Sequence, residues 1–323
     1  MLNKKIIAAA FAVAFTATGL TGCSQPENNT VTIATHDSFV ISDELKASFE
    51  KKTGLKLTVV QLGDAGSLTN KLVLTKDDPV ADAYFGIDNT FLSRAQDAGV
   101  LKSSEEVDFG DVCLNYDKYW FRDHSIAAPT DLADLVKTEY KGLTVLENPA
   151  TSSPGLAFLA TTVAEFGDPG YEQYWQELKA NDVKLAASWD DAYFVDFSGS
   201  SGKGSYPIVL SYSTSPAYEV RDDGQPQTAA VLNKCFRQFE YAGVLTNAKH
   251  PNNAQKLVDF LKSEEFQNSI AESMYVYPSV LYPKGVPADW TNFGVAADST
   301  IGENLNIGKD RDNWIKTVTA LFG

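Results

Sequence analysis

The chain has 323 residues, a formal charge of −15, 44% apolar and 11% aromatic side chains, and three cysteines. The apolar content is enough for a sizeable core, and the length is typical of two domains or one large one, so global disorder is excluded. The acidic balance argues against nucleic acid or an anionic membrane surface as the partner, because phosphates are bound by basic patches. Three cysteines exclude a disulfide-dense scaffold and a four-thiolate zinc site.

The first residues have the composition of an export signal. Two lysines precede the apolar run 6–20, which is too short to span a bilayer comfortably. Leu-Thr-Gly-Cys, ending at Cys23, then resembles a bacterial lipobox, whose cysteine is lipidated and becomes the new N-terminus. We expect a lipoprotein signal peptide at 1–22, a polar tether at 23–29, and lipid anchoring to the outer face of the cell membrane. A plain signal peptide with an incidental cysteine is the alternative.

Strands and helices alternate after the tether. Residues 30–35 alternate in side-chain type and predict a strand. Ser42 can cap a helix that ends at Gly54, and residues 55–59 predict a second strand. The same patterns predict strands at 81–85, 143–146, 183–187 and 207–212, and helices at 67–75, 89–98, 153–165, 171–180, from 253 onward and near 313–321. The alternation predicts an α/β fold, with parallel or mixed sheets and helices on both faces.

Small polar residues follow four of these strands. They occupy 35–38, 63–67, 86–89 and 150–155. Helix capping explains any one of these turns. Because ligands of open parallel sheets bind beyond the carboxyl ends of the strands, the four turns together favour a ligand cleft.

Large aromatic side chains lie beside predicted loops. Trp189 and Tyr193 form one group, Tyr212 and Tyr218 a second, and Tyr275 follows a predicted helix. Such rings are usually core, but at strand ends they favour a site for a flat or cationic ligand. A cation over a ring contributes ~0.5–2 kcal/mol, whereas a nanomolar ligand needs ~12 kcal/mol, so carboxylates and hydrogen bonds must contribute as well.

Catalytic and metal-binding signatures are missing from the sequence. It contains no Gly-x-Ser-x-Gly elbow, His-Glu-x-x-His pair or paired cysteine motif. A triad assembled from distant residues stays open. We predict a protein that is not an enzyme and that has no cofactor and no metal.

Two cysteines would remain in an oxidising compartment after export. Cys113 and Cys235 both lie in strand-like runs, 122 positions apart. A disulfide and two buried free thiols are both compatible with this pattern.

Five sequence blocks carry a family resemblance. The two most specific are Asn-Pro-Ala-Thr-Ser-Ser-Pro-Gly-Leu at 148–156 and Leu-Ser-Tyr-Ser-Thr-Ser-Pro-Ala-Tyr at 210–218. The shorter ones are Thr-His-Asp-Ser-Phe at 35–39, Gly-Ile-Asp-Asn at 86–89, and Val-Asp-Phe-Gly at 107–110 followed by Asn-Tyr-Asp-Lys at 115–118. These blocks resemble those of the thiamine-binding solute receptors of ABC transporters, and they run in the same order along essentially the whole mature chain.

The resemblance implies a type II periplasmic-binding-protein fold. Two α/β lobes would be joined by two crossover strands lying side by side, here 112–116 and 233–239. This arrangement would bring Cys113 and Cys235 together and favours the disulfide. The approximate boundaries are 30–111 plus 238–278 for lobe I, and 112–237 plus 279–323 for lobe II.

The resemblance also implies where the ligand binds. Trp189 and Tyr218 fall where the family stacks the thiamine rings, and Tyr212 falls on a ligand-contacting tyrosine. Tyr275 stands where the family has a tryptophan, and His36 where it has a tyrosine. Tyr193 is a further candidate beside Trp189.

Polar groups complete the implied site. Asp64 and Ala65 fall on the turn that approaches the phosphate end of phosphorylated thiamine, and Ser152 falls on a hydroxyl near it. The carboxylates that could neutralise the thiazolium or orient the aminopyrimidine are Asp37, Asp88 and Asp190.

We therefore predict a monomeric, lipid-anchored receptor that closes on thiamine and hands it to an ABC transporter permease. The phosphate esters of thiamine are further candidate ligands. A ferric-iron or other small-solute receptor of the same fold is the alternative, with Tyr212, Tyr218 and His36 recruited as ligands, although adjacent tyrosines are absent. A third hypothesis is an exported hydrolase acting on a thiamine-like substrate.

Overall fold

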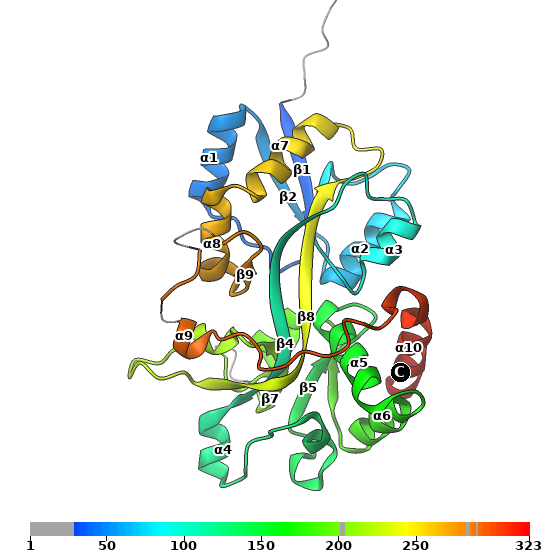
Figure 1. The fold of residues 1–323 in the computed structure, drawn as a ribbon, viewed down its shortest axis with the longest axis vertical. Coiled ribbons are helices and arrows are strands. Elements are labelled where there is room, and N and C mark those ends of the chain that lie inside the picture. The colour runs from blue at the N-terminus through cyan, green and yellow to red at the C-terminus, as the bar shows by residue number, and fades with distance from the viewer. Residues whose placement is uncertain (1–28, 201–203, 282–284, 289) are drawn as a thin grey trace, which may run out of the picture.

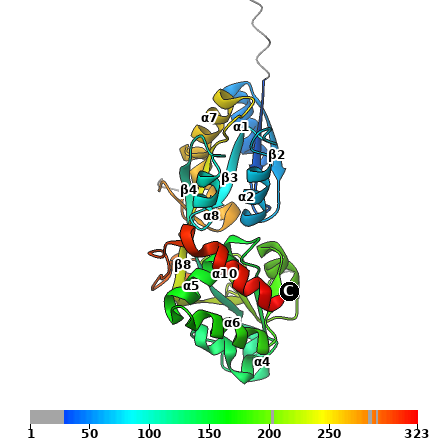
Figure 2. The same cartoon turned by 90° about the vertical axis from the view of Figure 1, so that its right-hand side faces the viewer.

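The chain forms two lobes, one above the other, in a computed structural model that describes residues 29–200, 204–281, 285–288 and 290–323 (Figure 1). A view turned by 90° shows the same two lobes (Figure 2). The expected signal peptide 1–22, Cys23 and the tether up to residue 28 lie outside the described residues. No helix in the described ranges combines the length and the apolar character needed to cross a membrane.

The upper lobe in Figure 1 is built on three neighbouring strands. The strand β1 pairs in parallel with both β2 and β3. The strands are β1 (Thr30–Thr35), β2 (Lys56–Gln61) and β3 (Ala83–Asp88), and the helices are α1 (Asp43–Thr53), α2 (Ala65–Leu74), α3 (Leu92–Asp97), α7 (Pro251–Leu261) and α8 (Glu264–Met274).

Local capping explains where these helices begin. Ser42 accepts a hydrogen bond from the backbone N–H of Leu45 at 3.2 Å and Gly54 ends α1 at φ 72°, which confirms that predicted helix. The predicted 67–75 helix begins two residues earlier, because Asp64 is its N-cap. The predicted 89–98 helix begins only at Leu92, because the Asp88 carboxylate accepts the N–H groups of Thr90 and Phe91 and holds a turn there.

Two long antiparallel strands run through both lobes (Figure 1). They are β4 (Glu105–Asp117) and β8 (Thr228–Val244), and both are longer than the predicted crossover strands. They join all described strands into one sheet of order β2-β1-β3-β8-β4-β7-β5-β6, in which β9 (Tyr277–Pro278) pairs with β4. The sheet is mixed, because β8 runs antiparallel to β3 and β7 runs antiparallel to β4.

The lower lobe repeats the strand–helix alternation. The strand β5 lies between β6 and β7 and is parallel to both. The strands are β5 (Thr144–Glu147), β6 (Lys184–Ala186) and β7 (Ile208–Tyr212), the helices are α4 (Lys118–His124), α5 (Ser153–Phe166), α6 (Gly170–Ala180), α9 (Trp290–Phe293) and α10 (Ile307–Phe322), and short helices cover Leu132–Val136, Thr138–Tyr140, Asp191–Asp196 and Ser215–Ala217.

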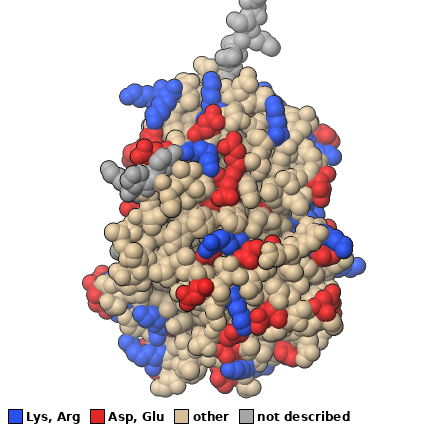
Figure 3. Space-filling view, viewed as in Figure 1, with Lys and Arg blue, Asp and Glu red and all other residues tan. Residues whose placement is uncertain are grey.

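Three apolar clusters form the interior of the described lobes, the smallest of them around Tyr193 and Phe197 in the lower lobe. In the upper lobe, Phe49, Phe85 and Phe266 are buried in one cluster. A larger cluster includes Leu68 on α2 and Trp175 on α6 and therefore continues from one lobe to the other. Acidic and basic side chains are interspersed over the face seen in Figure 3, so the net negative charge is spread over that face rather than gathered in one patch.

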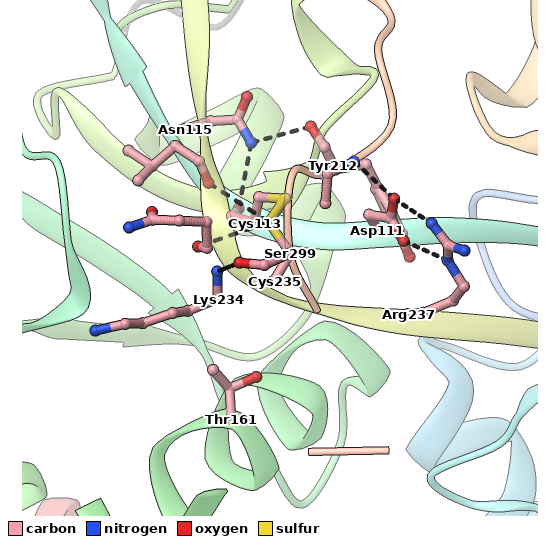
Figure 4. The surroundings of a disulfide bond; sticks show 12 residues. Asp111, Cys113, Asn115, Thr161, Tyr212, Lys234, Cys235, Arg237 and Ser299 are labelled. Carbon is pink, nitrogen blue, oxygen red and sulfur yellow. Dashed lines mark hydrogen bonds and ion pairs between the residues drawn. A yellow bond between two sulfur atoms is a disulfide. The ribbon is translucent and has the colours of Figure 1, made fainter. Parts of the chain in front are cut away.

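A disulfide links β4 and β8, the two strands that run through both lobes, near the middle of each strand (Figure 4). Cys113 on β4 and Cys235 on β8 are joined by an S–S bond of 2.02 Å, with their Cα atoms 4.7 Å apart. Beside it, the Arg237 guanidinium donates to both carboxylate oxygens of Asp111, at 2.8 and 3.0 Å. Because the buried Asp111 oxygen also accepts from the N–H of Ala297, this pair ties the C-terminal part of the chain to both strands.

Candidate ligand-binding site

A cavity of about 300 Å³ lies between the lobes and is lined by both of them. Its volume is at the lower end of the usual range for ligand pockets, ~300–1,000 Å³. Nine of the predicted site residues line it: His36, Asp37, Asp64, Trp189, Asp190, Tyr193, Tyr212, Tyr218 and Tyr275. The cavity therefore gathers predicted residues that are far apart in the sequence, from His36 to Tyr275.

Trp189 forms one aromatic wall of this cavity. Its indole stacks on the buried Tyr193 ring, with centroids 4.9 Å apart and planes 16° apart. The indole N–H donates to the Ser211 hydroxyl at 3.0 Å, and Phe194 meets the indole edge-on at 5.3 Å. These contacts hold the indole in a fixed orientation in the absence of a ligand.

Tyr218 and Tyr275 form a second aromatic group. Their rings meet edge-on at 4.7 Å, and Tyr275 also stacks on Trp290 at 6.2 Å. Tyr218 is 46% exposed and can therefore still lose surface to a ligand. Phe194 contacts both Trp189 and Tyr218, so the two rings belong to one crevice although they do not stack on each other.

Carboxylates make the cavity acidic. Asp37, Asp64, Asp190 and Glu240 all line it. The Ser38 hydroxyl donates to Asp190 at 2.9 Å, and burial raises the pKa of that carboxyl. This set suits a positively charged ligand.

His36 is paired with Glu240 across the cavity floor. Its Nε2 lies 3.2 Å from a carboxylate oxygen of Glu240 on β8. Burial opposes the imidazolium, but the attraction of Glu240, helped by Asp64 and Asp190, outweighs it and raises the pKa of His36. The pair connects the carboxyl end of β1 to β8, one of the two long strands that run through both lobes.

Asp64 connects the two lobes. Its carboxylate accepts the N–H of Ala65 at 2.6 Å and the N–H of Trp189 at 2.9 Å. Burial raises the pKa of Asp64, although the hydrogen bonds from the backbone N–H groups of Trp189 and Ala65 oppose that shift. The aromatic wall is therefore anchored to the start of α2.

Three predicted site residues lie outside the lining. Ala65 is buried within α2, and Ser152 is fully buried at the start of α5, close to Asp64. Asp88 is fully buried as well, and its carboxylate accepts a hydrogen bond from the Thr90 hydroxyl. Its burial raises the pKa of Asp88 to about 7.

Several lining residues escaped the sequence reasoning. Phe194 could have been found, because it belongs to the same aromatic run as Trp189 and Tyr193. Ser38 lies in a turn that had already been singled out. Glu240 gives no local signal, because only strand pairing brings it to His36, 204 positions away.

The class of protein follows from the sequence profile together with this architecture. Residues 102–309 match the bacterial extracellular solute-binding proteins, and the chain belongs to that family. It is a transport receptor and not an enzyme, so the hydrolase hypothesis is set aside. Within the described part of the chain, no group of three or more His, Cys, Asp or Glu side chains is placed to hold a metal ion.

Individual relatives narrow the comparison. The chain is 30% identical over 281 residues to the thiamine-binding periplasmic protein of Escherichia coli K12, covering 79% of this chain and 83% of that protein. A solved periplasmic thiamin binding protein superposes with a TM-score of 0.80 and 26% identity, over 91% of this chain and 96% of that one. A ferric binding protein from Campylobacter jejuni gives a TM-score of 0.71 at 17% identity, over 90% and 99% of the two chains. The predicted two-lobed type II periplasmic-binding-protein fold is confirmed.

Proposed function

We propose that this chain is an extracytoplasmic receptor that binds thiamine between its lobes and delivers it to an ABC transporter permease. The observation that carries the proposal is that Trp189 and Tyr218 share one cavity with four carboxylates. Thiamine has two flat rings, one of them a cationic thiazolium. The thiamine-binding relatives support the same ligand.

The site offers a separate interaction for each part of that ligand. The indole of Trp189 and the ring of Tyr218 supply faces for stacking and for cation–π attraction, worth ~0.5–2 kcal/mol. Asp190 and Asp37 are available for the positive charge and for the amino group of the pyrimidine. Closure of the lobes around the ligand would exclude water and make each of these polar contacts stronger than it is in solution.

Direct contacts between the lobes support closure around the ligand. The backbone N–H of Gly66 in the upper lobe donates to Thr151 of the lower lobe at 3.0 Å. The Thr214 hydroxyl donates to the carbonyl of Tyr275, again across the lobes. We propose that residues 30–111 and 238–278 form the upper lobe and that residues 112–237 and 279–323 form the lower lobe. The hinge movement would take place in β4 and β8, the two strands that run through both lobes.

Calorimetry with thiamine on the chain without residues 1–22 tests the proposal. Trp189→Ala is expected to weaken binding at least tenfold, ~1.4 kcal/mol, because it removes the main stacking face. Trp120→Ala is the matched control, since Trp120 packs on His124 of α4 and does not line the cavity. A folded wild-type protein that gives no binding heat at micromolar concentration would exclude thiamine.

The anchoring part of the proposal concerns Cys23. We propose that its thiol is lipidated after removal of residues 1–22 and holds the receptor at the outer face of the membrane. Cys23→Ala should release the protein from the membrane fraction of expressing cells, while thiamine binding by the released protein is unchanged. Retention of the variant on the membrane would refute the anchor.

The ferric alternative is less well supported. Tyr212, Tyr218 and His36 do line one cavity, but burial raises the pKa of Tyr212, which opposes the phenolate that ferric iron requires. The Tyr212 hydroxyl instead lies 3.5 Å from the amide oxygen of Gln238. A visible charge-transfer band on addition of ferric iron would reverse this preference.

A further inference from the structure

The cavity between the lobes contains one side chain whose charge opposes that of a cationic ligand. Among the cavity-lining residues of the described chain, His36 is the one that can carry a positive charge. Its ring packs on the backbone of Gly86, where any side chain would collide with the imidazole, and on the ring of Phe85 at 5.6 Å. Its Nε2 lies 3.2 Å from a carboxylate oxygen of Glu240. The imidazole is therefore held in place as the partner of that carboxylate.

Glu240 lies between two other carboxyl groups in the sheet. Asp88 on β3 and Asp108 on β4 are both register partners of Glu240 on β8. Both aspartates are fully buried, and neither oxygen of Asp108 accepts a hydrogen bond from the described residues. The side-chain amide of Gln238 donates to Glu240 at 3.1 Å but carries no charge. The imidazolium of His36 thus supplies the positive charge that the neighbouring strands do not.

The other charged groups that face the imidazole are acidic. Asp64 at the start of α2 and Asp190 before the short helix 191–196 both attract the imidazolium, and Asp37 lines the same cavity. Tyr212 on β7 also lines it, and burial raises the pKa of this phenol, which keeps the ring neutral. Lys262 of α8 does not line the cavity and donates instead to the Ser279 hydroxyl at 2.9 Å. In the absence of a ligand, the surroundings therefore favour a protonated His36.

A thiazolium ring in this cavity would compete with the imidazolium for the same carboxylates. In a space of about 300 Å³ the two positive charges would lie within one Debye length, ~8–10 Å, so salt would not remove their repulsion. A nearby cation disfavours the charged form of an imidazole. The N–H bond of the imidazolium would break, the proton would pass to the buffer, and the thiazolium would replace the lost positive charge.

We infer that thiamine and the proton of His36 exclude each other, so that binding of the ligand releases a proton from the His36–Glu240 pair and acid weakens binding. The inference rests on the proposed function and adds a proton to its binding equilibrium. Because the coupling is reciprocal, the proton lowers the affinity for thiamine by the same factor by which thiamine lowers the affinity for the proton.

Calorimetry with thiamine in PIPES and in Tris at about pH 7 tests the inference. The two binding heats differ by the number of protons released, multiplied by the difference between the ionisation enthalpies of the buffers. We expect about 0.3–1 proton per thiamine, and an affinity that falls at least about fivefold between pH 8 and pH 6, within the limit of about tenfold per pH unit for one proton.

Two variants identify the source of the proton. His36→Gln cannot become charged, so it should release less than about 0.2 proton and keep its affinity within about twofold over the same pH range. Asp88→Asn is the matched control, because Asp88 does not line the cavity although its pKa is raised to about 7 by burial. This variant should release protons as the wild type does. Loss of the release in Asp88→Asn, with the release retained in His36→Gln, would overturn the inference.

Proton NMR of the wild type covers the case in which His36→Gln does not fold. The chain has only three histidines, so His124→Gln and His250→Gln suffice to identify the imidazole signals of His36. Its pKa should fall by at least about 1 when thiamine is added. The signals of His124, which stacks on Trp120 outside the cavity, should not move.

The outcomes separate the inference from the proposed function. If thiamine binds without proton release and without a change in the pKa of His36, the inference is overturned and the proposed function stands. If thiamine does not bind to the folded wild type at any pH from about 6 to 8, the proposed function fails and the inference fails with it.

Discussion

The bond between Cys113 and Cys235 is expected to supply a large part of the stability of this protein. It closes a loop with a sequence separation of 122 residues and joins the two strands that both lobes share. In the chain-entropy account of cross-links, closing a loop of this length stabilises the folded state by about 5 kcal/mol. The Cys113→Ala/Cys235→Ala double variant should therefore unfold at much lower denaturant concentration.

Urea unfolding followed by tryptophan fluorescence measures this effect. With an m-value of about 3 kcal/mol/M, the loss corresponds to a midpoint lowered by roughly 1.5–2 M. Wild-type protein kept reduced is the matched control, because it retains both buried sulfur atoms and loses only the bond.

Agreement between the reduced wild type and the double variant would assign the loss to the cross-link. A double variant whose free energy of unfolding lies within about 1 kcal/mol of that of the oxidised wild type would refute the reasoning, because closing the loop would then contribute little to stability. Thiamine affinity measured well below the unfolding transition should not change, because neither cysteine lines the cavity.

Two further predictions concern buried titratable groups. The pKa of His36 is raised in the folded state. Its pairing with Glu240 therefore stabilises the folded protein fully below about pH 6.5, which is the pKa of histidine in the unfolded chain. This stabilisation is lost as the pH rises through the pKa of His36 in the folded state. In urea unfolding, His36→Gln should therefore be less stable than wild type near pH 5.5, and this difference should shrink as the pH rises; a difference that does not change with pH would refute the pairing. The pKa of Asp88 is raised to about 7, so ionisation of its buried carboxylate destabilises the fold increasingly from about pH 4 up to pH 7. The stability of Asp88→Asn relative to wild type should increase across that range. A difference in the free energy of unfolding that does not change with pH would contradict this account.

Much of the local structure could be predicted from side-chain patterns. The strand at 30–35 and the helix capped by Ser42 follow from residues that are close together in the sequence. The starts of α2 and α3 were misplaced, because only the direction of the carboxylates shows that Asp64 caps α2 and that Asp88 holds a turn before α3.

The aromatic part of the site was likewise accessible without coordinates. Tyr212 and Tyr218 lie in a block that resembles a known family, Trp189 and Tyr193 lie in an aromatic run beside a predicted loop, and all four rings line the cavity. The acidic part was predicted less well. Asp88 belongs to a similar polar turn, yet it is buried, whereas Glu240 lies within a strand and faces the cavity.

The amino-acid order alone therefore determined the secondary-structure elements, the α/β class and the aromatic character of the site, because capping and periodicity act over a few neighbouring residues. Only the tertiary structure decided which charges meet. The pairing of β8 with β3 and β4 carries Glu240 to His36 across 204 positions, and the contact between the lobes carries Asp64 to Trp189 across 125. Such contacts depend on strand register and on how two lobes meet, and no spacing within the chain encodes either of them directly.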